Sequence, residues 1–291
     1  MRILIFGGAG MLGHRLWMNL NQVHETWVTV REDVSQVPEI PEFPREYILP
    51  NIDVLKDEPV RYAINSVHPD LVINCVGLVK QLPLVKDPLS SIALNSLLPH
   101  RLALISREVG IRMIHFSTDC VFSGKKGGYV ESDASDAEDL YGRTKFLGEV
   151  AYPHTVTLRT SIIGRELKTR HGLIEWFLSQ EGTIQGYTRA IYTGFTTDEL
   201  SRIILNQVIP STNLNGIYHV SSEPISKYDL LMLVKESFGL SIDILPEEEP
   251  IVDRSLDSTR FRRATGYRPP TWRTMIDKLK ENSRIYEKLR G

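Results

Sequence analysis

A tyrosine and a lysine four residues apart, Tyr141 and Lys145, have types and a spacing that could do chemistry. The apolar residues around them predict a helix, on which side chains four residues apart share a face. A neighbouring ammonium stabilises a phenolate, so we expect the pKa of Tyr141 to fall below its usual value of about 10 and the phenol to act as a general acid or base. The same spacing also occurs by chance on surface helices. Upstream, the hydroxyls of Ser117 and Thr118 end a predicted strand.

A glycine-rich loop near the N-terminus has the pattern of a dinucleotide-binding turn. The predicted strand 3–6 runs directly into Gly-Gly-Ala-Gly-Met-Leu-Gly at 7–13, and a predicted helix follows. Glycines let the backbone turn tightly and approach a pyrophosphate, whose charge the helix N-terminus favours. A glycine-rich turn without a ligand is the alternative. Combined with the strand-end hydroxyls and the Tyr-Lys pair, the loop predicts a reduction site. The residues expected to contact the cofactor here are Gly7, Gly10, Met11, Leu12 and Gly13.

The residues after the second predicted strand bear on the choice between NADP(H) and NAD(H). About 20 residues past the glycines, an Asp or Glu would bind the ribose 2′-hydroxyl of NAD. Arg31 stands there instead. A guanidinium matches a 2′-phosphate in charge and geometry, so NADP(H) is favoured over NAD(H). Against this, Glu32 and Asp33 follow at once, and a shift by one residue would bring a carboxylate to the site. Arg15 is a further candidate for the phosphate, although we expect it to be solvated.

Two further strand ends complete the predicted cofactor site. Asp53 and Val54 follow the third predicted strand, where the carboxylate could accept the adenine amino group; a surface-loop aspartate is the alternative. Asn74, Cys75 and Val76 end the fourth strand. In a parallel sheet this carboxyl edge is where ligands bind.

Short apolar runs alternate with helical stretches through the first two thirds of the chain. Continuous apolar strands separated by helices predict a parallel sheet that is covered on both faces, and so a doubly wound Rossmann α/β fold with a smaller C-terminal substrate lobe. We expect the NADP-binding part to span 1–165, with a returning segment at about 190–222, and the lobe to span about 166–189 and 223–291. The predicted strands are 2–6, 26–30, 71–74, 111–116, 155–158, 216–220 and 241–245, and the predicted helices are 11–20, 55–66, 88–109, 140–152, 197–208, 227–238 and 272–289.

Composition and charge exclude several classes of protein. The 34 basic and 36 acidic residues give a net charge of −2, without the basic excess of a nucleic-acid-binding protein. No apolar run approaches the roughly 18 residues of a membrane helix, and the N-terminal run is shorter than the ~7 to 15 residues of a secretory signal. The two cysteines, Cys75 and Cys120, have no metal-ligand spacing, so no metal site is expected. We therefore expect a cytoplasmic protein with no nucleic-acid or membrane partner.

At the level of motifs, the sequence resembles the extended short-chain dehydrogenase/reductase superfamily and, within it, the dTDP-4-dehydrorhamnose reductase family. The likeness covers nearly the whole chain. The motifs that carry it are Phe6-Gly7 with Gly10 and Gly13, Asn74, Asn95, Ser117-Thr118-Asp119, Val121-Phe122-Ser123-Gly124, Tyr141 with Lys145, and Leu158-Arg159-Thr160-Ser161.

This resemblance implies a catalytic trio of Thr118, Tyr141 and Lys145. Thr118 would hold the sugar keto oxygen, Tyr141 would donate the proton as hydride arrives from the nicotinamide, and Lys145 would bind the nicotinamide ribose and lower the pKa of Tyr141. The implied reaction is NADPH- or NADH-dependent reduction of a nucleotide-linked 4-keto-6-deoxy sugar, as in polysaccharide biosynthesis. It also implies a homodimer paired through the helices 88–109 and 140–152. Asp119 and Cys120 would line the sugar pocket.

Departures from the family leave the substrate open. Family members usually carry Tyr after the Thr-Asp pair and Trp after Arg-Thr-Ser, where this chain has Cys120 and Ile162. An exact dTDP-rhamnose product is therefore in doubt, and another nucleotide-linked 4-keto sugar fits equally. In the lobe, Arg254 resembles a residue near the sugar-nucleotide phosphates and could clamp a diphosphate. Its alternative is a loop ion pair with Asp253 or Glu249.

Two other functions are compatible with the residues. In the GDP-fucose synthase branch of the superfamily, a Cys after the catalytic hydroxyl works with a His to epimerise the sugar, and Cys120 and His171 are the candidates here. Alternatively Cys120 is a buried filler and His171 a surface residue. The chain also resembles reductase-like regulatory subunits, such as the β subunit of methionine adenosyltransferase, which would bind NADP without consuming it.

Overall fold

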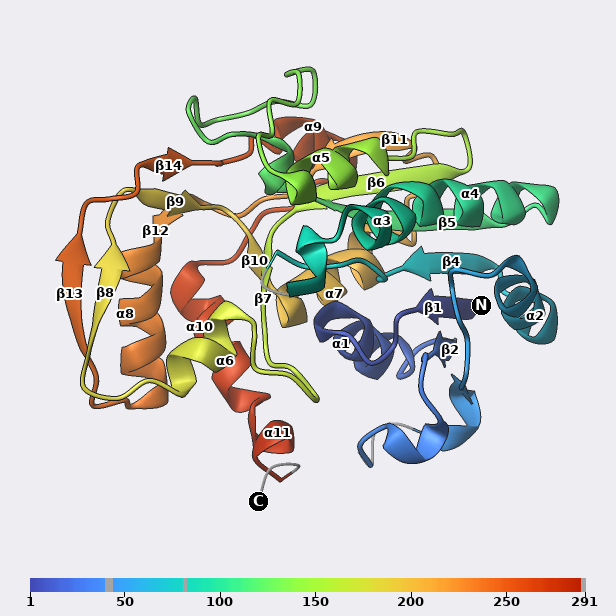
Figure 1. Ribbon diagram of the computed structural model, residues 1–291, viewed down its shortest axis with the longest axis horizontal. Coiled ribbons are helices and arrows are strands. Elements are labelled where there is room, and N and C mark those ends of the chain that lie inside the picture. Colours follow the sequence, from blue (N-terminus) through green and yellow to red (C-terminus); the bar gives the residue numbers. More distant parts are fainter. Residues whose placement is uncertain (40–43, 81–82, 289–291) are drawn as a thin grey trace.

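The computed structural model describes residues 1–39, 44–80 and 83–288, and a parallel sheet forms their centre (Figure 1). Seven strands form this sheet in the order β11-β6-β5-β4-β1-β2-β3. The chain therefore moves outward in one direction from β1 to β3 and in the other from β4 to β11, which confirms the predicted doubly wound fold. The strands are β1 Arg2–Phe6, β2 Glu25–Thr29, β3 Ile48–Leu49, β4 Leu71–Asn74, β5 Arg112–Thr118, β6 Thr155–Thr160 and β11 Gly216–His219.

Helices cover both faces of the sheet, which is why nearly all side chains of its central strands are buried. In β1, Ile3 and Ile5 enter one core, and Leu4 and Phe6 enter the core on the opposite face. Successive side chains of a strand point to opposite faces, so all four are buried. None of the described helices is long and apolar enough to cross a membrane. The helices of this part are α1 Met11–Leu20, α2 Asp57–Val67, α3 Pro88–Ser91, α4 Leu98–Glu108, α5 Leu140–Leu147 and α7 Thr197–Ile203, with π-helical turns at Ile92–Leu97 and Ile204–Val208.

Several predicted boundaries are confirmed, and three long helices differ. The predicted helix 272–289 is divided into α10 Trp272–Glu281 and α11 Arg284–Lys288, and its last residue lies outside the described residues. The strand 71–74 and the helices 11–20 and 227–238 match the predictions. The predicted helix 88–109 contains the π-helical turn Ile92–Leu97 between α3 and α4. The predicted helix 140–152 was wrong beyond Leu147, where α5 ends with Gly148 as its C-cap. Pro153 disfavours helical backbone at the residue before it, so the helix cannot continue to Tyr152.

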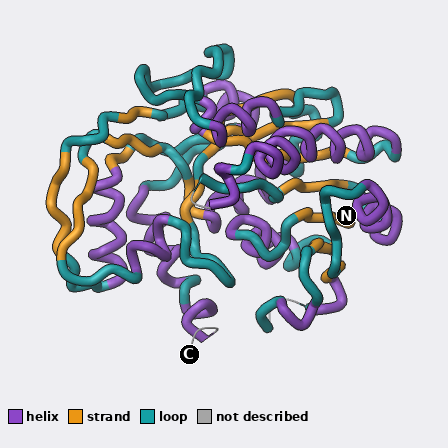
Figure 2. Tube along the Cα trace, viewed as in Figure 1, coloured by secondary structure: helices purple, strands orange, loops and turns teal. Residues whose placement is uncertain are grey.

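Short strands and helices form a smaller lobe beside the sheet (Figure 2). β7 pairs with β10, β9 lies between β12 and β14, and β8 pairs with β13 against α8. These strands are two to five residues long, which is why hydrophobic patterns predicted only β13, as a strand at 241–245, and missed the others. The elements are β7 Ile162–Ile163, β8 Thr183–Tyr187, β9 Ala190–Tyr192, β10 Phe195–Thr196, β12 Ile225–Ser226, β13 Asp243–Glu247, β14 Val252–Asp253, α6 Leu173–Leu178, α8 Lys227–Phe238, α9 Thr259–Thr265, α10 Trp272–Glu281 and α11 Arg284–Lys288.

Candidate active site

The glycine loop forms the tight turn that its sequence predicts. Gly7 has φ +90°, a conformation that favours glycine, and its carbonyl accepts the Gly10 N–H at 3.1 Å. A Cβ on Gly13 would lie 2.1 Å from the Gly7 oxygen, so only glycine lets α1 approach the loop this closely. Gly10 is the N-cap of α1 without a side-chain cap, and the first turn, with Met11 and Leu12, contains no acidic residue. This helix end therefore suits an anionic diphosphate.

The charged residues after β2 have different partners. Asp33 accepts the backbone N–H of Ser35 at 2.9 Å and its hydroxyl at 2.6 Å, and Glu32 forms an ion pair with Lys168 at 3.4 Å. Arg31 is exposed, and among the described residues it has no ion pair. The guanidinium is therefore the group here that remains available to an external anion.

Arg15 is not solvated, which corrects the expectation from sequence. It is buried in α1 and pairs with Asp198 of α7, Nη2 to Oδ1, at 2.7 Å. Helices α1 and α7 pack against each other, so the ion pair lies inside their contact. Arg15 is thus committed within the protein and cannot reach a 2′-phosphate.

The other predicted cofactor residues lie at or after the ends of strands β3 and β4. Asp53 accepts the Leu55 N–H at 3.1 Å and is half-buried together with Val54. Asn74 is buried at the end of β4, and its Oδ1 accepts the Val76 N–H at 3.0 Å.

Thr118 ends β5 and begins a short turn. Its hydroxyl accepts the Cys120 N–H and donates to an Asp119 carboxylate oxygen, both at 3.1 Å. The strand partner of Thr118 is Thr160 at the end of β6, so these residues share the carboxyl edge of the sheet. Burial raises the pKa of the Asp119 carboxyl.

Helix α5 brings Tyr141 to this edge. The helix is capped by Asp139, whose side chain accepts the Gly142 N–H at 2.7 Å. A Cβ on Gly142 would lie 2.2 Å from the Cys120 carbonyl oxygen, so α5 lies directly against the 118–121 turn. One turn further along, Lys145 is buried and its Nζ donates to the Phe116 carbonyl oxygen at 2.7 Å.

The predicted fall in the pKa of Tyr141 was wrong for this state of the protein. Burial raises the pKa of Tyr141, and a side-chain hydrogen bond with Thr118 opposes only part of the rise. Burial also lowers the pKa of Lys145 to about 8. Desolvation disfavours the charged form of both groups, and the Lys145 ammonium is directed to a backbone carbonyl. The Tyr141 phenol therefore keeps its proton at neutral pH.

Asn95, in the π-helical turn Ile92–Leu97, packs against the part of the site formed by α5. It is fully buried, accepts the Leu78 N–H at 2.8 Å, and its Nδ2 lies 3.4 Å from the Thr144 hydroxyl of α5. A Cβ on Gly77 would lie 3.2 Å from the Asn95 side chain and 3.8 Å from the Lys145 Nζ. Because π-turns are often found at functional sites, the distortion of this helix fits the placement of Asn95 beside Lys145.

The structure brings Arg254 to Cys120. The Arg254 Nε donates to the Phe122 carbonyl oxygen at 2.8 Å, and the guanidinium charge lowers the pKa values of both Asp119 and Cys120. Burial outweighs this effect and raises the pKa of the Cys120 thiol to about 12. Cys75 is half-buried, and desolvation likewise raises the pKa of its thiol.

His171 is not brought to Cys120. It is exposed, and its backbone N–H donates to Glu166 at 2.8 Å. The following residue, Gly172, lies against the Met11 side chain at the glycine loop. The groups whose interactions shift the Cys120 pKa are Asp119, Arg254, Thr118 and Lys80, and His171 is not one of them.

Two residues near this site were missed from the sequence. Lys80 forms an ion pair with the capping residue Asp139 at 2.6 Å. Tyr192 of β9 is buried, and the charges of Asp119 and Cys120 add to the rise that burial causes in its pKa. Neither had a motif, because each approaches the site through the tertiary fold.

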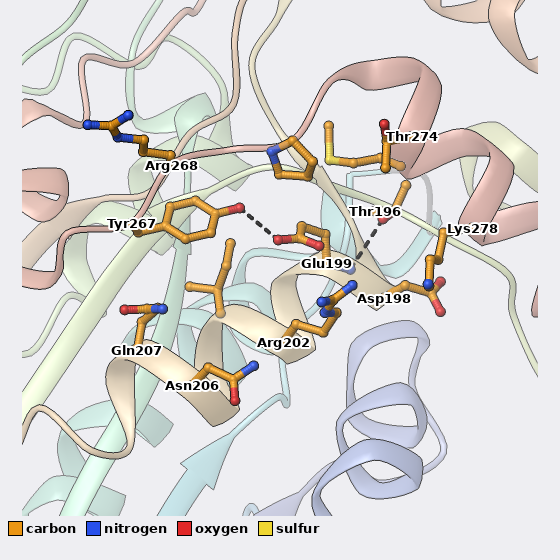
Figure 3. A pocket seen from close by; sticks show the side chains of 13 residues that line it. Thr196, Asp198, Glu199, Arg202, Asn206, Gln207, Tyr267, Arg268, Thr274 and Lys278 are labelled. Carbon is orange, nitrogen blue, oxygen red and sulfur yellow. Dashed lines mark hydrogen bonds between the residues drawn. The ribbon is translucent and has the colours of Figure 1, made fainter.

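A cavity of about 430 Å³ lies away from these residues, between α7, α10 and the segment 267–270 (Figure 3). The Tyr267 hydroxyl donates to Glu199 at 2.8 Å on its wall. None of the predicted catalytic or binding residues lines it.

The doubly wound sheet, the glycine loop after β1, Thr118 at the end of β5 and the Tyr-Lys pair on α5 together define an extended short-chain dehydrogenase/reductase. The chain belongs to the family described as the RmlD substrate binding domain, whose model matches residues 1–285.

Similar proteins span this chain nearly end to end. The spore coat polysaccharide biosynthesis protein SpsK of Bacillus subtilis (strain 168) is 26% identical over 97% of this chain and 98% of its own length. Methionine adenosyltransferase 2 subunit beta of Danio rerio is 26% identical over 85% of this chain and 77% of its own length. A dTDP-4-dehydrorhamnose reductase of Bacillus anthracis, solved in complex with NADP, has the same fold, with a TM-score of 0.79, 19% identity and coverage of 97% of this chain and 99% of that one.

Proposed function

We propose that the protein is an NAD(P)H-dependent reductase of a nucleotide-linked 4-keto-6-deoxy sugar. The observation that carries this proposal is the half-buried Tyr141, which lies next to Thr118 at the carboxyl edge of the sheet and is followed one turn later by the buried Lys145. Membership of the RmlD family and the likeness to a solved dTDP-4-dehydrorhamnose reductase support the sugar-nucleotide class.

The protonated Tyr141 is suited to donate a proton to a carbonyl oxygen that becomes an alkoxide. Thr118 would hold that oxygen. Lys145 lies one turn from Tyr141 on α5, where it would bind a ribose hydroxyl of the cofactor. The bound nicotinamide would supply the hydride. A buried site excludes water and strengthens each of these contacts.

The cofactor that we propose is NADP(H), in preference to NAD(H). The tight glycine turn and the acid-free N-terminus of α1 fit a diphosphate. The exposed Arg31, which has no ion pair within the described part of the chain, fits a 2′-phosphate. The neighbouring Asp33 is engaged with Ser35, which argues against its binding a ribose hydroxyl.

We propose that residues 1–165 and about 190–222 bind the cofactor. The lobe, about 166–189 and 223–291, would bind the sugar nucleotide. Support comes from the returning segment, in which β11 pairs with β6 and α7 packs on α1. From the lobe, Arg254 approaches Asp119 and Cys120, where it could bind a diphosphate.

A homodimer is also proposed, through the helices α3 to α5. Large apolar side chains are exposed along these helices and the π-turn between them, and a second copy would cover them. Sedimentation of the purified protein tests this, and a monomer at micromolar concentration contradicts it. The exposed residues are Leu89, Ile92, Leu97, Leu104, Phe146 and Leu147.

Turnover tests the proposed function. The purified protein is mixed with NADPH or NADH and with a 4-keto-6-deoxy sugar linked to dTDP, UDP, GDP or CDP, and absorbance at the nicotinamide band is followed. We expect NADPH or NADH to be oxidised with at least one of these sugars. With dTDP-glucose, which lacks the ketone, we expect no oxidation of NADPH or NADH. Thermal shifts with the two nicotinamide nucleotides test the preference, because a larger shift with NADH contradicts the Arg31 argument.

The likeness to methionine adenosyltransferase 2 subunit beta favours a second candidate, a binding subunit without turnover. Such a protein would be stabilised by NADP(H) but would consume none with any of the ketosugars. The same experiment therefore separates the two functions.

A further inference from the structure

His14 links the glycine loop to the C-terminal helix. It is fully buried on α1, with Nδ1 2.7 Å from the Gly10 carbonyl oxygen and Nε2 2.6 Å from the Tyr286 hydroxyl of α11. The two rings meet edge to face, with their centroids 5.6 Å apart. Tyr286 is itself buried. The His14 imidazole thus joins the glycine loop to Tyr286, which is 272 positions further along the chain.

The chemistry of the partners determines the protonation of this ring. A carbonyl oxygen only accepts, so Nδ1 must carry the proton and donate it to Gly10. Burial lowers the pKa of His14 to about 4, so the ring is neutral at pH 7 and Nε2 is left as an acceptor. The Tyr286 hydroxyl must then donate to Nε2.

The Gly10 carbonyl oxygen accepts two hydrogen bonds from His14. It accepts the backbone N–H of His14 at 3.1 Å as well as the imidazole Nδ1–H. In a trans peptide the carbonyl and the following N–H point in opposite directions. With the Gly10 carbonyl directed along α1 toward His14, the Met11 N–H is directed out of the helix N-terminus, toward the place where a diphosphate would bind.

The same C-terminal segment holds α1 at a second point. Asp198, which pairs with Arg15 and is seen beside the cavity in Figure 3, accepts the Asn282 Nδ2–H at 2.5 Å. The Arg165 guanidinium lies 5.2 Å from the centroid of the Tyr286 ring. Through Tyr286, α11 thus contacts both α1 and Arg165, which follows β7.

We propose that His14 is a positioning residue for the nucleotide diphosphate, and that Tyr286, through His14, sets the affinity of the glycine loop for the cofactor. This inference rests on the proposed nucleotide binding. We expect an effect on binding rather than on proton transfer, because the hydrogen bonds of the His14 ring join the loop backbone to Tyr286.

The test is Tyr286→Phe, which removes the hydroxyl donor and keeps the ring against Arg165. The loss of one hydrogen bond is expected to raise the Kd for NADPH about 2- to 10-fold while kcat at saturating nucleotide is unchanged. Tyr152→Phe is the matched control, because the Tyr152 hydroxyl lies 3.1 Å from His100 Nδ1 in a similar edge-to-face pair, away from the loop. It should leave the NADPH Kd unaltered, with both variants measured far below their melting temperatures.

Two results would overturn the inference. If the unmodified protein binds NADPH but Tyr286→Phe binds it as tightly as Tyr152→Phe does, Tyr286 has no part in positioning. If ¹⁵N NMR of the unmodified protein finds the His14 proton on Nε2, the ring does not hold the Gly10 carbonyl. If the unmodified protein binds neither NADPH nor NADH, the proposed function itself is wrong. That result is distinct from the two outcomes above, which contradict only the role of His14 and Tyr286.

Discussion

The glycine loop is built from consecutive residues, 7–13, whereas the groups around Cys120 come from distant parts of the chain: Thr118, Lys80, Arg254 and Tyr192. In the first region the backbone itself forms the binding surface. In the second, side chains from the sheet and the lobe meet only after folding. The proposed cofactor end is therefore a local feature of the sequence, and the proposed sugar end is a product of tertiary packing.

A buried, neutral histidine nevertheless lies near each of these proposed ends. At the cofactor end His14 joins Gly10 to Tyr286, and at the other His219 joins the Tyr129 carbonyl, at 3.0 Å, to Arg159, at 3.2 Å. Arg159 in turn forms a buried ion pair with Glu149, which follows α5. The comparison can be sharpened by variants that damage one end and spare the other.

The largest effect is expected from Tyr141→Phe, which removes the proposed proton donor. Loss of a general acid typically lowers the rate by about 10²- to 10⁴-fold, and kcat should fall by that much. The Kd for NADPH, measured by fluorescence, should stay the same, because the phenol is not part of the glycine loop. A variant with normal turnover would remove Tyr141 from the reaction.

Acid should destabilise both ends together. Burial lowers the pKa values of His14 and His219 from 6.5 to about 4, so between these pH values the unfolded chain binds more protons than the folded chain. The stabilisation is present above pH 6.5 and is lost as the pH falls toward 4, by about 3 kcal/mol for each histidine. Urea unfolding across this range measures it, and a flat profile would contradict the neutral histidines.

Gly13→Ala should damage the cofactor end alone. The added Cβ would meet the Gly7 carbonyl oxygen at 2.1 Å, and overpacking of this kind costs about 1 to 3 kcal/mol. We expect a lower melting temperature and weaker NADPH binding. Gly10→Ala is the contrast, since its Cβ would lie 3.4 Å from the same oxygen. It should melt normally and still bind less nucleotide; equal melting of the two variants would argue against the close packing.

An effect of similar size is expected at the proposed sugar end from Arg254→Gln. Losing a charge-assisted contact with a diphosphate costs about 1.5 to 3 kcal/mol, so KM for the sugar nucleotide should rise about 10-fold or more. The NADPH Kd should not change. An unaltered KM would leave Arg254 with its structural contact to Phe122 alone.

These two regions also differ in how far the sequence predicted them. The strand 71–74 and the helix 11–20 followed from apolar patterns, and the glycine loop from its motif. The burial of Arg15 could not be predicted from the sequence, because its partner Asp198 is far away in the chain. The direction of the Tyr141 pKa was missed for a similar reason: spacing places Lys145 on the same face but cannot supply the desolvation or the Phe116 carbonyl that binds its ammonium.

The state of the two cysteines has a consequence for oxidation. Only a thiolate reacts readily with peroxides, disulfides or alkylating agents. With its pKa at about 12, Cys120 is thiolate in only about one molecule in 10⁵ at pH 7, and burial keeps Cys75 protonated too. Although a thiol lies beside the proposed site of reduction, the protein should tolerate oxidising conditions that inactivate enzymes with exposed, acidic thiols.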